Sequence, residues 1–511
     1  MLPILTPAES AHLDRESADR GVTVDELMEN AGREVARRVV KLVGGAYGHR
    51  ALVVCGKGNN GGDGWVVARY LDRWGMGVSV VMAEPSTLRG AAGANFGRFA
   101  GRGGRWREFS PHLVERELAR ADVVVDALFG TGFRGRPEGH LAHIIRSINR
   151  ASAPVVAVDI PSGVEGETGA VRGDAVEARL TVALGTLKPG LVFHPGAAHA
   201  GTIEVADIGF PADLVRTDLW LLEATDVAAE LEPREAESHK RSVGVVLVVA
   251  GSRDMTGAAA LTAKAAYRAG AGLVTLAAPP SVLSTVQPSI PDLTFLPLPA
   301  TEDGTISRDA WPVLRERIQS FDAVAIGPGL STNPSTSSFV RTMVAESPVR
   351  FVLDADGLNA FAGRSGLLAD RASDAILTPH AGEFGRLTGL SAKEVVEDRV
   401  GHARKAAAEF RCAVLLKGSR TVVADPNGTT FVNPTGGSYL ATGGTGDVLT
   451  GAIAGFIAGG LAPVRAGAMA AYVHGVAGQL AAERQGEGTI ASDVLFHLGE
   501  ALVRVRTSSA A

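Results

Sequence analysis

Short runs of β-branched and other apolar residues alternate along this chain with longer segments whose apolar residues recur at helical spacing. In the first half the clearest apolar runs are residues 51–55, 78–82, 122–126 and 154–159, each followed by a Gly-rich turn and a helical stretch. Strands that are apolar along their whole length and alternate with helices indicate a parallel sheet covered on both faces. Two helices with Ser/Thr-type caps, residues 6–20 and 23–43, are predicted ahead of the first strand.

The pattern weakens after Phe210, and a second alternating series then begins. Its predicted strands are residues 243–250, 273–277, 323–326, 351–353, 375–378 and 413–416, and it ends in two Ala-rich helices at 445–458 and 464–483. We therefore predict two α/β domains, residues 1–215 and 236–505. A charged linker without a strand is predicted at residues 216–235.

Composition narrows the class of protein. The chain has 511 residues, of which 46% are hydrophobic and 21% charged, so each half can bury a core of its own. A net charge of -5 argues against a nucleic-acid or anionic-membrane surface. Cys55 and Cys412 both lie in apolar runs. We therefore predict that they are buried thiols of a protein in a reducing compartment. No long apolar segment or basic leader is apparent, and we expect a cytoplasmic protein.

A glycine-rich turn follows the first strand of the first half. It reads Gly56-Lys57-Gly58-Asn59-Asn60-Gly61-Gly62-Asp63-Gly64. Glycines in such number let the backbone approach a bound group closely, with amides directed at an anion near a helix start. The spacing matches neither the dinucleotide fingerprint nor a Walker loop. The turn is predicted to be a functional site.

Carboxylates and a hydroxyl mark the ends of the next two strands, where open α/β sheets bind their ligands. Asp126 leads into a loop with two arginines, and Asp159 is followed closely by Ser162. Together with Asn60, the oxygens of Asp126 and Ser162 suit a weakly bound cation better than zinc.

The GNNGGDG turn, the DALFGTG strand end and the VDIPSG strand end together resemble the N-terminal half of YjeF-type proteins over residues 1–215. The resemblance implies a Rossmann-like three-layer sandwich with NAD(P)H-hydrate epimerase activity and a potassium ion held by Asn60, Asp126 and Ser162. It makes Asp159 the candidate general acid/base, with Lys188 as a possible assistant. The residues implied to contact the hydrated dinucleotide are Asn59, Asn60, Gly61, Gly62, Asp63, Gly130, Thr131, Gly132, Phe133, Arg134, Gly135, Arg136 and Asp159.

The most informative segment of the second half is residues 433–447, which ends in Gly443-Gly444-Thr445-Gly446-Asp447 and opens a long helix. Free amides at a helix start form an anion hole, and Asp447 would lie in the first turn beside a bound phosphate. A carboxylate next to an anion hole supplies the base and the donors that phosphoryl transfer to a hydroxyl needs.

Four other pieces accompany this turn. They are the strand-end loops around Gly329 and around His380 and Glu383, the helix start at Ala258, and a turn between two strands. In this order the set resembles the ribokinase-like superfamily, and within it the ADP-dependent NAD(P)H-hydrate dehydratases, over residues 236–505. The resemblance implies that Ala258, Gly329, His380 and Asp447 contact the hydrated dinucleotide. It implies adenine-nucleotide contacts from Lys417, Gly418, Ser419, Arg420, Thr421 and Gly446.

The two resemblances combine into one predicted activity, the repair of hydrated NADH and NADPH (NADHX and NADPHX), as in the bifunctional NAD(P)H-hydrate repair family. The first domain would interconvert the R and S hydrates, and the second would dehydrate the S form with ADP, giving the dinucleotide, AMP and phosphate. Magnesium would be held mostly by phosphate and water. ADP is implied by resemblance to the bacterial form alone, since ADP and ATP present the same adenosine. The family also implies a homo-oligomer.

An alternative is a small-molecule kinase of the ribokinase class fused to a non-catalytic binding domain. The Gly-Asp turn fits a kinase equally well. The TPHAGEF and KGSRT segments favour the dehydratase, and the first half retains both Asp159 and the glycine-rich turn, which favours a catalytic domain.

Overall fold

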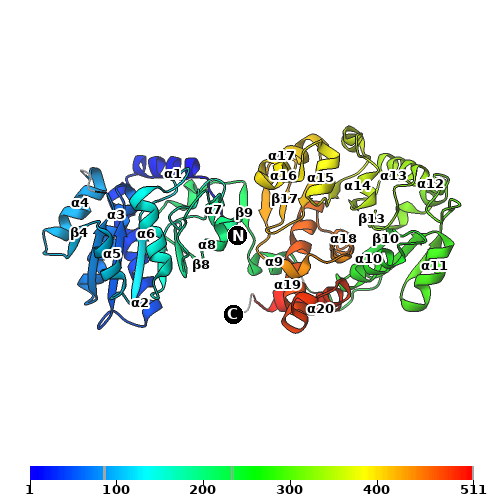
Figure 1. Cartoon of the computed structure of the whole chain (residues 1–511). Helices are drawn as coiled ribbons and strands as arrows, with labels where there is room; N and C mark the ends of the chain where they lie inside the picture. Colours follow the sequence, from blue (N-terminus) through cyan, green and yellow to red (C-terminus); the bar gives the residue numbers. More distant parts are fainter. Residues whose placement is uncertain (85–87, 232, 234, 509–511) are drawn as a thin grey trace. The chain divides into compact units, whose positions relative to one another are not determined.

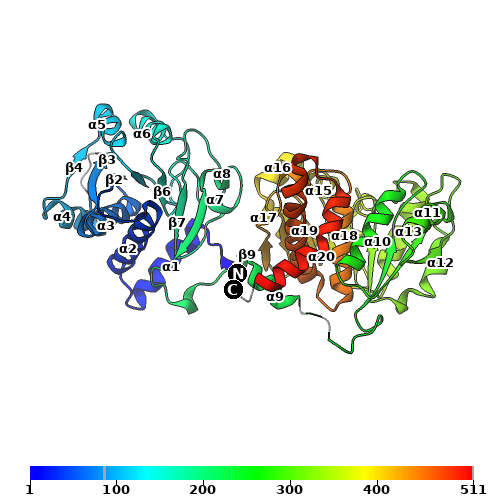
Figure 2. The ribbon, with the colours of Figure 1, turned by 90° about the horizontal axis from the view of Figure 1, so that it is seen from below.

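The computed structural model describes residues 1–84, 88–231, 233 and 235–508. The chain forms two compact units, Leu2–Thr217 and Asp218–Ala511, the second of which also includes Met1. Below they are the N-terminal and C-terminal units. Both are α/β, as predicted, with helices on the two faces of a sheet (Figure 1 and Figure 2). Within the described residues, every helix is too short or too polar to span a bilayer.

The N-terminal unit is built on one parallel sheet of seven strands in the order β4-β3-β2-β5-β6-β7-β8. Helices α2, α3 and α4 pack on one face, and α5 and α6 on the other. Its elements are β1 (Leu2–Pro3), α1 (Pro7–Asp19), α2 (Val24–Val43), β2 (Arg50–Cys55), α3 (Asn59–Arg73), β3 (Gly77–Met82), α4 (Gly90–Ala100), β4 (Trp106–Glu108), α5 (Pro111–Leu118), β5 (Val123–Ala127), α6 (Gly139–Arg150), β6 (Val155–Val158), β7 (Leu180–Leu184), α7 (Pro189–Val192), α8 (Gly196–His199), β8 (Thr202–Ala206) and the 3₁₀ turn η1 (Ala212–Leu214).

The first two helices begin where the sequence predicts. Thr6 and Thr23 each accept a hydrogen bond from the backbone of a glutamate three residues on, and each glutamate bonds back to the threonine N–H. This reciprocal pairing satisfies two otherwise free donors at each helix start. The cap residues alone therefore fix these two boundaries to within one residue.

The C-terminal unit contains a mixed sheet in which β9, β18, β17, β16, β15, β14, β13, β10, β11 and β12 follow one another. Strands β10 to β16 are parallel to one another, whereas β17 is antiparallel to both β16 and β18. Helices α9, α10, α11, α18, α19 and α20 cover one face, and Figure 1 shows α13 to α17 on the other. Its elements are β9 (Leu219–Leu221), α9 (Ala224–Glu230), β10 (Val245–Val249), α10 (Thr256–Arg268), β11 (Leu273–Ala278), α11 (Pro280–Val286), η2 (Gln287–Ser289), β12 (Thr294–Pro297), α12 (Ala310–Arg315), η3 (Ile318–Ser320), β13 (Ala323–Ile326), α13 (Pro334–Glu346), β14 (Phe351–Leu353), α14 (Asp356–Asn359), η4 (Ser365–Asp370), β15 (Ala375–Leu377), α15 (Ala381–Thr388), α16 (Ala392–Glu397), α17 (Arg399–Phe410), β16 (Ala413–Leu416), β17 (Val422–Ala424), β18 (Thr430–Val432), η5 (Ser438–Leu440), α18 (Thr445–Ala458), α19 (Pro463–Gln485), η6 (Gly486–Gly488) and α20 (Ala491–Thr507).

The segment predicted as a linker, residues 216–235, differs from that prediction where the structure describes it. It contains β9, which pairs with β18, and α9, which packs on α20. The reason is burial: Leu219, Leu222, Val227 and Leu231 are all less than 9% exposed, which a free linker would not be. The unit also ends in a third helix, α20, after the two that were predicted.

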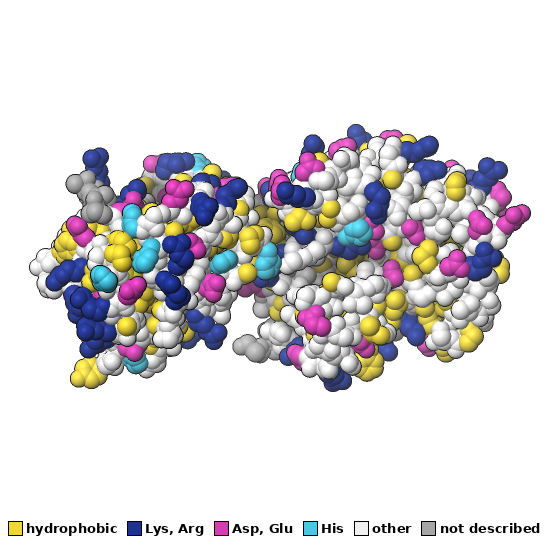
Figure 3. Space-filling view, viewed as in Figure 1, with side chains coloured by type: hydrophobic (Ala, Val, Ile, Leu, Met, Phe, Trp, Pro, Cys, Tyr) yellow, Lys and Arg dark blue, Asp and Glu magenta, His cyan; other side chains and the backbone are white. Residues whose placement is uncertain are grey.

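Figure 3 shows one face of the molecule, on which both basic and acidic side chains occur over each unit. The net charge of the chain is -5.

Candidate active sites

A cavity of about 690 Å³ opens at the carboxyl ends of the strands of the N-terminal unit. Its walls come from the turns after β2, β3, β5, β6 and β7 and from α1 and α2. Of the predicted site residues it is lined by Asn59, Asn60, Asp63, Gly130, Thr131, Gly132, Phe133 and Asp159, together with Lys188. The cavity lies where parallel sheets bind ligands.

The residues of the glycine-rich turn have two different roles. Some line the cavity, and others allow helix α3 to pack closely against neighbouring residues. A Cβ on Gly61 would lie 2.0 Å from the carbonyl oxygen of Gly56, and one on Gly62 would lie 2.6 Å from Cε of Met28. Both glycines therefore let α3 begin against its neighbours, and the cavity wall is made by Asn59, Asn60 and Asp63.

The loop after β5 also divides. Its first part, Gly130 to Phe133, lines the cavity. Its second part engages other groups: Arg134 pairs with Glu167 at 3.4 Å, and the Gly135 N–H donates to Glu165 over 3.0 Å. Arg136 packs against Gly173. The arginines and Gly135 are thus held away from the cavity that Asp159 lines.

Asp159 and Lys188 form a buried ion pair at the end of β6. Oδ1 of Asp159 accepts from Nζ of Lys188 and from the Leu184 N–H at 3.0 Å. Lys188 is 3% exposed and also donates to the Leu184 carbonyl, so its position is fixed. Lys188 is therefore a fixed part of the cavity wall beside Asp159. Asp159 has φ 66°, a left-handed conformation that costs a non-glycine residue about 1 kcal/mol and is typical of functional sites.

Two further carboxylates lie near Asp159. Burial, reinforced by the charges of Asp159 and Asp14, raises the pKa of Asp63 well above its ordinary value. Burial likewise raises the pKa of Asp14, a cavity residue on α1, although Lys188 opposes the rise. Asp63 therefore keeps its proton to a higher pH than an exposed aspartate does. Asp14 could not be predicted from the sequence, because an aspartate within an amphipathic helix carries no local signal of a site.

The three residues predicted to hold a cation lie together. Ser162 Oγ donates to Asp126 Oδ1 over 2.6 Å, and Asn60 Nδ2 donates to the Phe129 carbonyl over 2.7 Å. The Ser162 hydroxyl is 3.4 Å from that same carbonyl. Burial raises the pKa of Asp126 to about 6, against the hydrogen bonds from Ser162 and Leu128, so the carboxylate is mostly ionised at pH 7. A carboxylate, an amide, a hydroxyl and a carbonyl are the donors that a hard, weakly bound cation takes.

In the C-terminal unit, Asp447 is the third residue of α18 and directly follows Gly446. Gly444 has φ 89°, a conformation that favours glycine, and ends the loop just before the helix. No side chain caps the helix, so the N–H groups of its first turn have no side-chain acceptor. A helix start of this kind can bind an anion.

Lys417, directly after β16, pairs with two buried carboxylates. Its Nζ donates to Asp354 Oδ1 over 2.7 Å and lies 3.7 Å from Glu383 Oε2. The other oxygen of Asp354 accepts from Thr450 Oγ1 at 2.6 Å. A Cβ on Gly446 would lie 3.5 Å from Nζ of Lys417, so the cluster borders the anion hole directly.

The charges of this cluster set the protonation of its members. Burial lowers the pKa of Lys417, but Asp354 and Glu383 more than compensate and raise it above its ordinary value. Burial, with Asp354 adding to it and Lys417 opposing it, raises the pKa of Asp447 to about 7. Asp447 can therefore take up a proton near neutral pH, as a general base must.

Asp354 was not predicted as a site residue. It could have been, because a carboxylate at the end of a parallel strand marks a candidate site, as in the first half of the chain. It directly follows strand β14, as Asp126 and Asp159 mark the ends of strands in the other unit. A Cβ on Gly327 would lie 1.8 Å from the Asp354 carbonyl, so that glycine permits two strand ends to meet.

The other predicted residues of this unit lie around the same edge. Gly329 and Ala258 touch, since a Cβ on Gly329 would lie 3.0 Å from that of Ala258. His380 is the N-cap of α15: its Nδ1 accepts from the N–H groups of Gly382 and Glu383, and its ring is half exposed.

The turn from Lys417 to Thr421 joins β16 to β17. Arg420 donates to the Pro434 carbonyl over 2.7 Å and thereby ties the turn to the glycine-rich segment. Gly418 lies against the guanidinium of Arg399, whose Nη2 donates to the Leu416 carbonyl. Ser419 is exposed.

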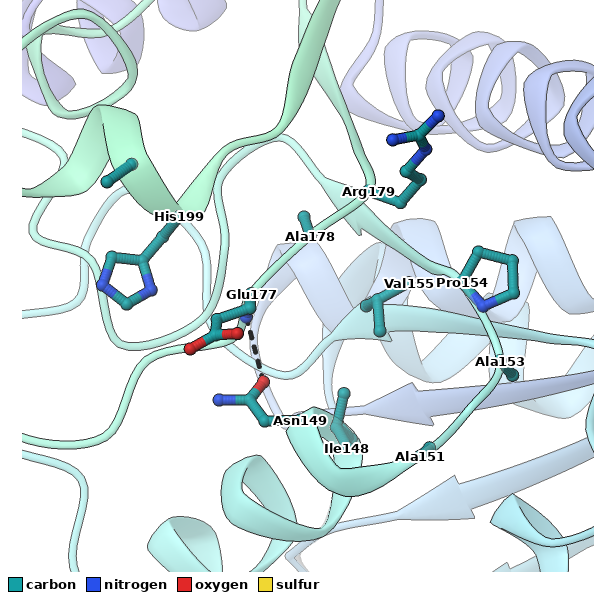
Figure 4. Close-up of a pocket in the computed structure, with 11 residues that line it drawn as sticks. Ile148, Asn149, Ala151, Ala153, Pro154, Val155, Glu177, Ala178, Arg179 and His199 are labelled. Carbon is teal, nitrogen blue, oxygen red and sulfur yellow. Dashed lines mark hydrogen bonds between the residues drawn. The ribbon is translucent and has the colours of Figure 1, made fainter. Parts of the chain in front are cut away.

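A second cavity of about 490 Å³ lies at the opposite edge of the N-terminal sheet, where β6 and β7 begin. Figure 4 shows the Asn149 side chain accepting a hydrogen bond from the backbone N–H of Glu177, with His199 and Arg179 on either side. Asn149 also donates to the Ala175 carbonyl, so its polar groups are used in holding the loop. The lining residues include none of those at the strand ends described above.

Comparison with known proteins agrees with this division. Residues 24–190 match the family model of the YjeF-related protein N-terminus, and residues 246–498 match that of NAD(P)H-hydrate dehydratase. A curated protein of Moorella thermoacetica, described as a bifunctional NAD(P)H-hydrate repair enzyme, is 44% identical over 506 residues, which are 97% of this chain and 96% of that protein.

Solved structures resemble the C-terminal unit. The ADP/ATP-dependent NAD(P)H-hydrate dehydratase of Bacillus subtilis, crystallised with ATP and Mg²⁺, is 34% identical with a TM-score of 0.48, covering 56% of this chain and 97% of its own. A ribokinase-like superfamily protein of Enterococcus faecalis has a TM-score of 0.50 at 23% identity, covering 57% and 97%. The fold of this unit is therefore ribokinase-like.

Proposed function

The chain belongs to the bifunctional NAD(P)H-hydrate repair family, and we propose that its two units carry the two activities of that family. The N-terminal unit interconverts the R and S hydrates of NADH and NADPH, and the C-terminal unit dehydrates the S hydrate at the expense of a nucleoside diphosphate or triphosphate. The matches to both halves favour this function over a kinase fused to a non-catalytic domain.

The observation that carries the dehydratase is Asp447, a carboxylate with a pKa of about 7 at the start of an uncapped helix. In the proposed reaction the free amides of the first turn bind the terminal phosphoryl group of ADP. Asp447 removes the proton of the hydrate's hydroxyl as that oxygen attacks phosphorus, and AMP leaves. The ring nitrogen's lone pair then expels phosphate, a far better leaving group than hydroxide, and the dihydronicotinamide is restored after loss of a proton.

The other predicted contacts take supporting parts in this proposal. Lys417 balances the phosphoryl charge and is held for that role by Asp354. Gly446 offers a backbone N–H, and Gly418 to Thr421 bind the nucleotide. Ala258, Gly329 and His380 surround the hydrated ring. Mg²⁺ keeps several waters; it would be held mostly by phosphate oxygens and water and would neutralise phosphate charge when bound.

In the N-terminal unit we assign the proton transfers to Asp159, oriented by Lys188. Opening and reclosing the hydrate at its aminal carbon requires a group that gives and takes a proton. Asp63, whose pKa is raised by burial, lines the same cavity and contacts the substrate. Asn60, Asp126 and Ser162 would hold potassium, which would supply positive charge beside the dinucleotide.

The test of the whole proposal is spectroscopic. Purified S hydrate is mixed with the full chain and either ADP or ATP, and recovery of the dihydronicotinamide absorbance is followed. Recovery with at least one nucleotide supports the dehydratase, and the faster nucleotide identifies the co-substrate. No recovery with either nucleotide would refute the dehydratase.

The prediction that the chain forms a homo-oligomer stays a prediction.

A further inference from the structure

One buried side chain beside the anion hole has no part in the reaction outlined above. His474, on α19, is 7% exposed, and its Nε2 lies 2.9 Å from the carbonyl oxygen of Thr445. Thr445 is the first residue of α18 and directly precedes Gly446 and Asp447. The imidazole therefore contacts the backbone of the anion hole without lying in the hole.

The protonation state of His474 is fixed by its surroundings. Burial lowers its pKa to about 4, the bond to Thr445 opposes this, and the charge of Lys417 lowers it further. The ring is therefore neutral at pH 7 and carries one proton. Because a carbonyl oxygen can only accept, that proton must be on Nε2.

The geometry of the peptide bond carries the effect to the reacting group. The carbonyl of Thr445 and the N–H of Gly446 belong to the same planar unit, in which a trans bond points them in opposite directions. A donor held on the carbonyl thus fixes where the Gly446 N–H points and polarises the amide, which strengthens it as a donor. Lys417 and Asp354 are neighbours of Gly446, since a Cβ there would lie 3.5 Å from Nζ and 3.8 Å from Oδ2.

The same face of α19 also accepts hydrogen bonds from the beginning of the glycine-rich segment, residues 433–447. Asn433 donates to the Ala471 carbonyl over 3.0 Å, and Thr435 Oγ1 donates to that of Tyr472 over 2.8 Å. A Cβ on Gly475 would lie 2.1 Å from Thr435 Oγ1, so the helix and the segment touch closely. His474 is the member of this face that reaches the first turn of α18.

We propose that His474 is a positioning residue for phosphoryl transfer: its neutral imidazole holds and polarises the Thr445–Gly446 peptide so that the Gly446 N–H donates to the transferring phosphoryl group. The inference rests on the proposed dehydratase function. It predicts that the contact matters most in the transition state, where phosphoryl charge is redistributed, so its loss lowers kcat more than it raises KM.

The experiment compares two variants in the full chain. His474→Phe keeps an aromatic ring and removes the donor, whereas His474→Gln keeps an N–H of similar reach. We expect His474→Phe to lower kcat for S hydrate with ADP by about 100-fold, the scale of one oxyanion-hole donor. KM should change less than threefold, and His474→Gln should recover much of the loss. Thermal unfolding of both variants reports whether the C-terminal unit stays folded.

Wild-type kcat in His474→Phe would overturn the inference, as would equal losses in both variants. Absence of dehydration by the wild-type chain is a different result, since it refutes the proposed function itself. If the phenylalanine variant does not fold, ¹⁵N NMR of the wild-type imidazole decides instead. A neutral ring protonated on Nε2 down to about pH 5 is expected, and a cationic ring or an Nδ1 proton at pH 7 would contradict the proposal.

Discussion

Nζ of Lys417 donates a hydrogen bond to Oδ1 of Asp354 over 2.7 Å, although the two residues are 63 positions apart in the chain. The contact joins the ends of β16 and β14 beneath the anion hole. It orients the cation that faces Gly446, and its carboxylate raises the pKa of Asp447. The electrostatics of the dehydratase site therefore depend on this pair.

Asp354→Asn should move the pH dependence of the dehydratase. Asp354 raises the pKa of Asp447, so its loss lowers that pKa from about 7, and the acid limb of kcat/KM shifts to lower pH. Removing one partner of a buried ion pair should also destabilise the C-terminal unit by about 3 kcal/mol. A pH–rate profile and thermal unfolding check both effects. Asp356→Asn is the matched control, because Asp356 raises the same pKa less; an equal shift in both variants would contradict the assignment.

Asp447→Asn should trade activity for stability. Loss of a general base lowers kcat about 100- to 10,000-fold. The pKa of Asp447 is raised from 3.8 to about 7, so its contribution to stability is complete below pH 3.8 and is lost as pH rises through 7. Asparagine stays neutral, so the variant should be more stable than wild type at pH 8 and by a smaller margin at pH 5. Chemical unfolding at the two pH values tests this, and a variant less stable at pH 8 would refute the burial argument.

Asp159→Asn should abolish rescue of R hydrate and spare rescue of S hydrate. The amide cannot exchange a proton in place of the carboxylate that Lys188 orients. We expect R-hydrate consumption to fall at least 100-fold, followed as recovery of absorbance in the presence of ADP. Asp447→Asn is the reciprocal control, since it should stop dehydration while NMR still shows exchange between the two hydrates. Rapid R-hydrate rescue by Asp159→Asn would rule out Asp159 as the acid/base.

Potassium should stabilise the N-terminal unit above pH 6. The ion and a proton compete for Asp126, whose pKa is about 6, so binding weakens as the carboxylate is protonated. A thermal shift in KCl relative to choline chloride of equal ionic strength is expected at pH 7.5 and should largely disappear at pH 5. Ser162→Ala removes one of the predicted ligands and should reduce the shift. The same shift with choline would show that no specific site is filled.

Gly56→Ala should destabilise the N-terminal unit strongly. Its Cβ would lie 1.9 Å from the carbonyl oxygen of Leu128, a backbone atom that cannot move aside alone. Overpacking of this kind costs about 3 kcal/mol. Gly58→Ala is the control in the same turn, because its Cβ meets nothing within 4 Å. Equal melting temperatures for the two variants would contradict the model of close strand-end contact.

The two α/β units, the positions of their glycine-rich turns and several helix starts can be predicted from the residues alone. These features are local: apolar runs mark buried parallel strands, and the threonine–glutamate pairs at Thr6 and Thr23 cap their own helices. Asp447 could be assigned to an anion hole for the same reason, since the helix start and the carboxylate are adjacent in the chain.

Which side chains of the two sites contact one another depends on how distant parts of the chain fold together. Parallel strands bring residues tens of positions apart to one edge of the sheet, and this is how Lys188 meets Asp159 and Lys417 meets Asp354. Asp14 and His474 come from helices whose patterns show only which face is buried. Burial and neighbouring charge, which set the pKa values of Asp447 and Asp126, are properties of that assembled edge. The chemistry of each site therefore follows from contacts that no local pattern contains.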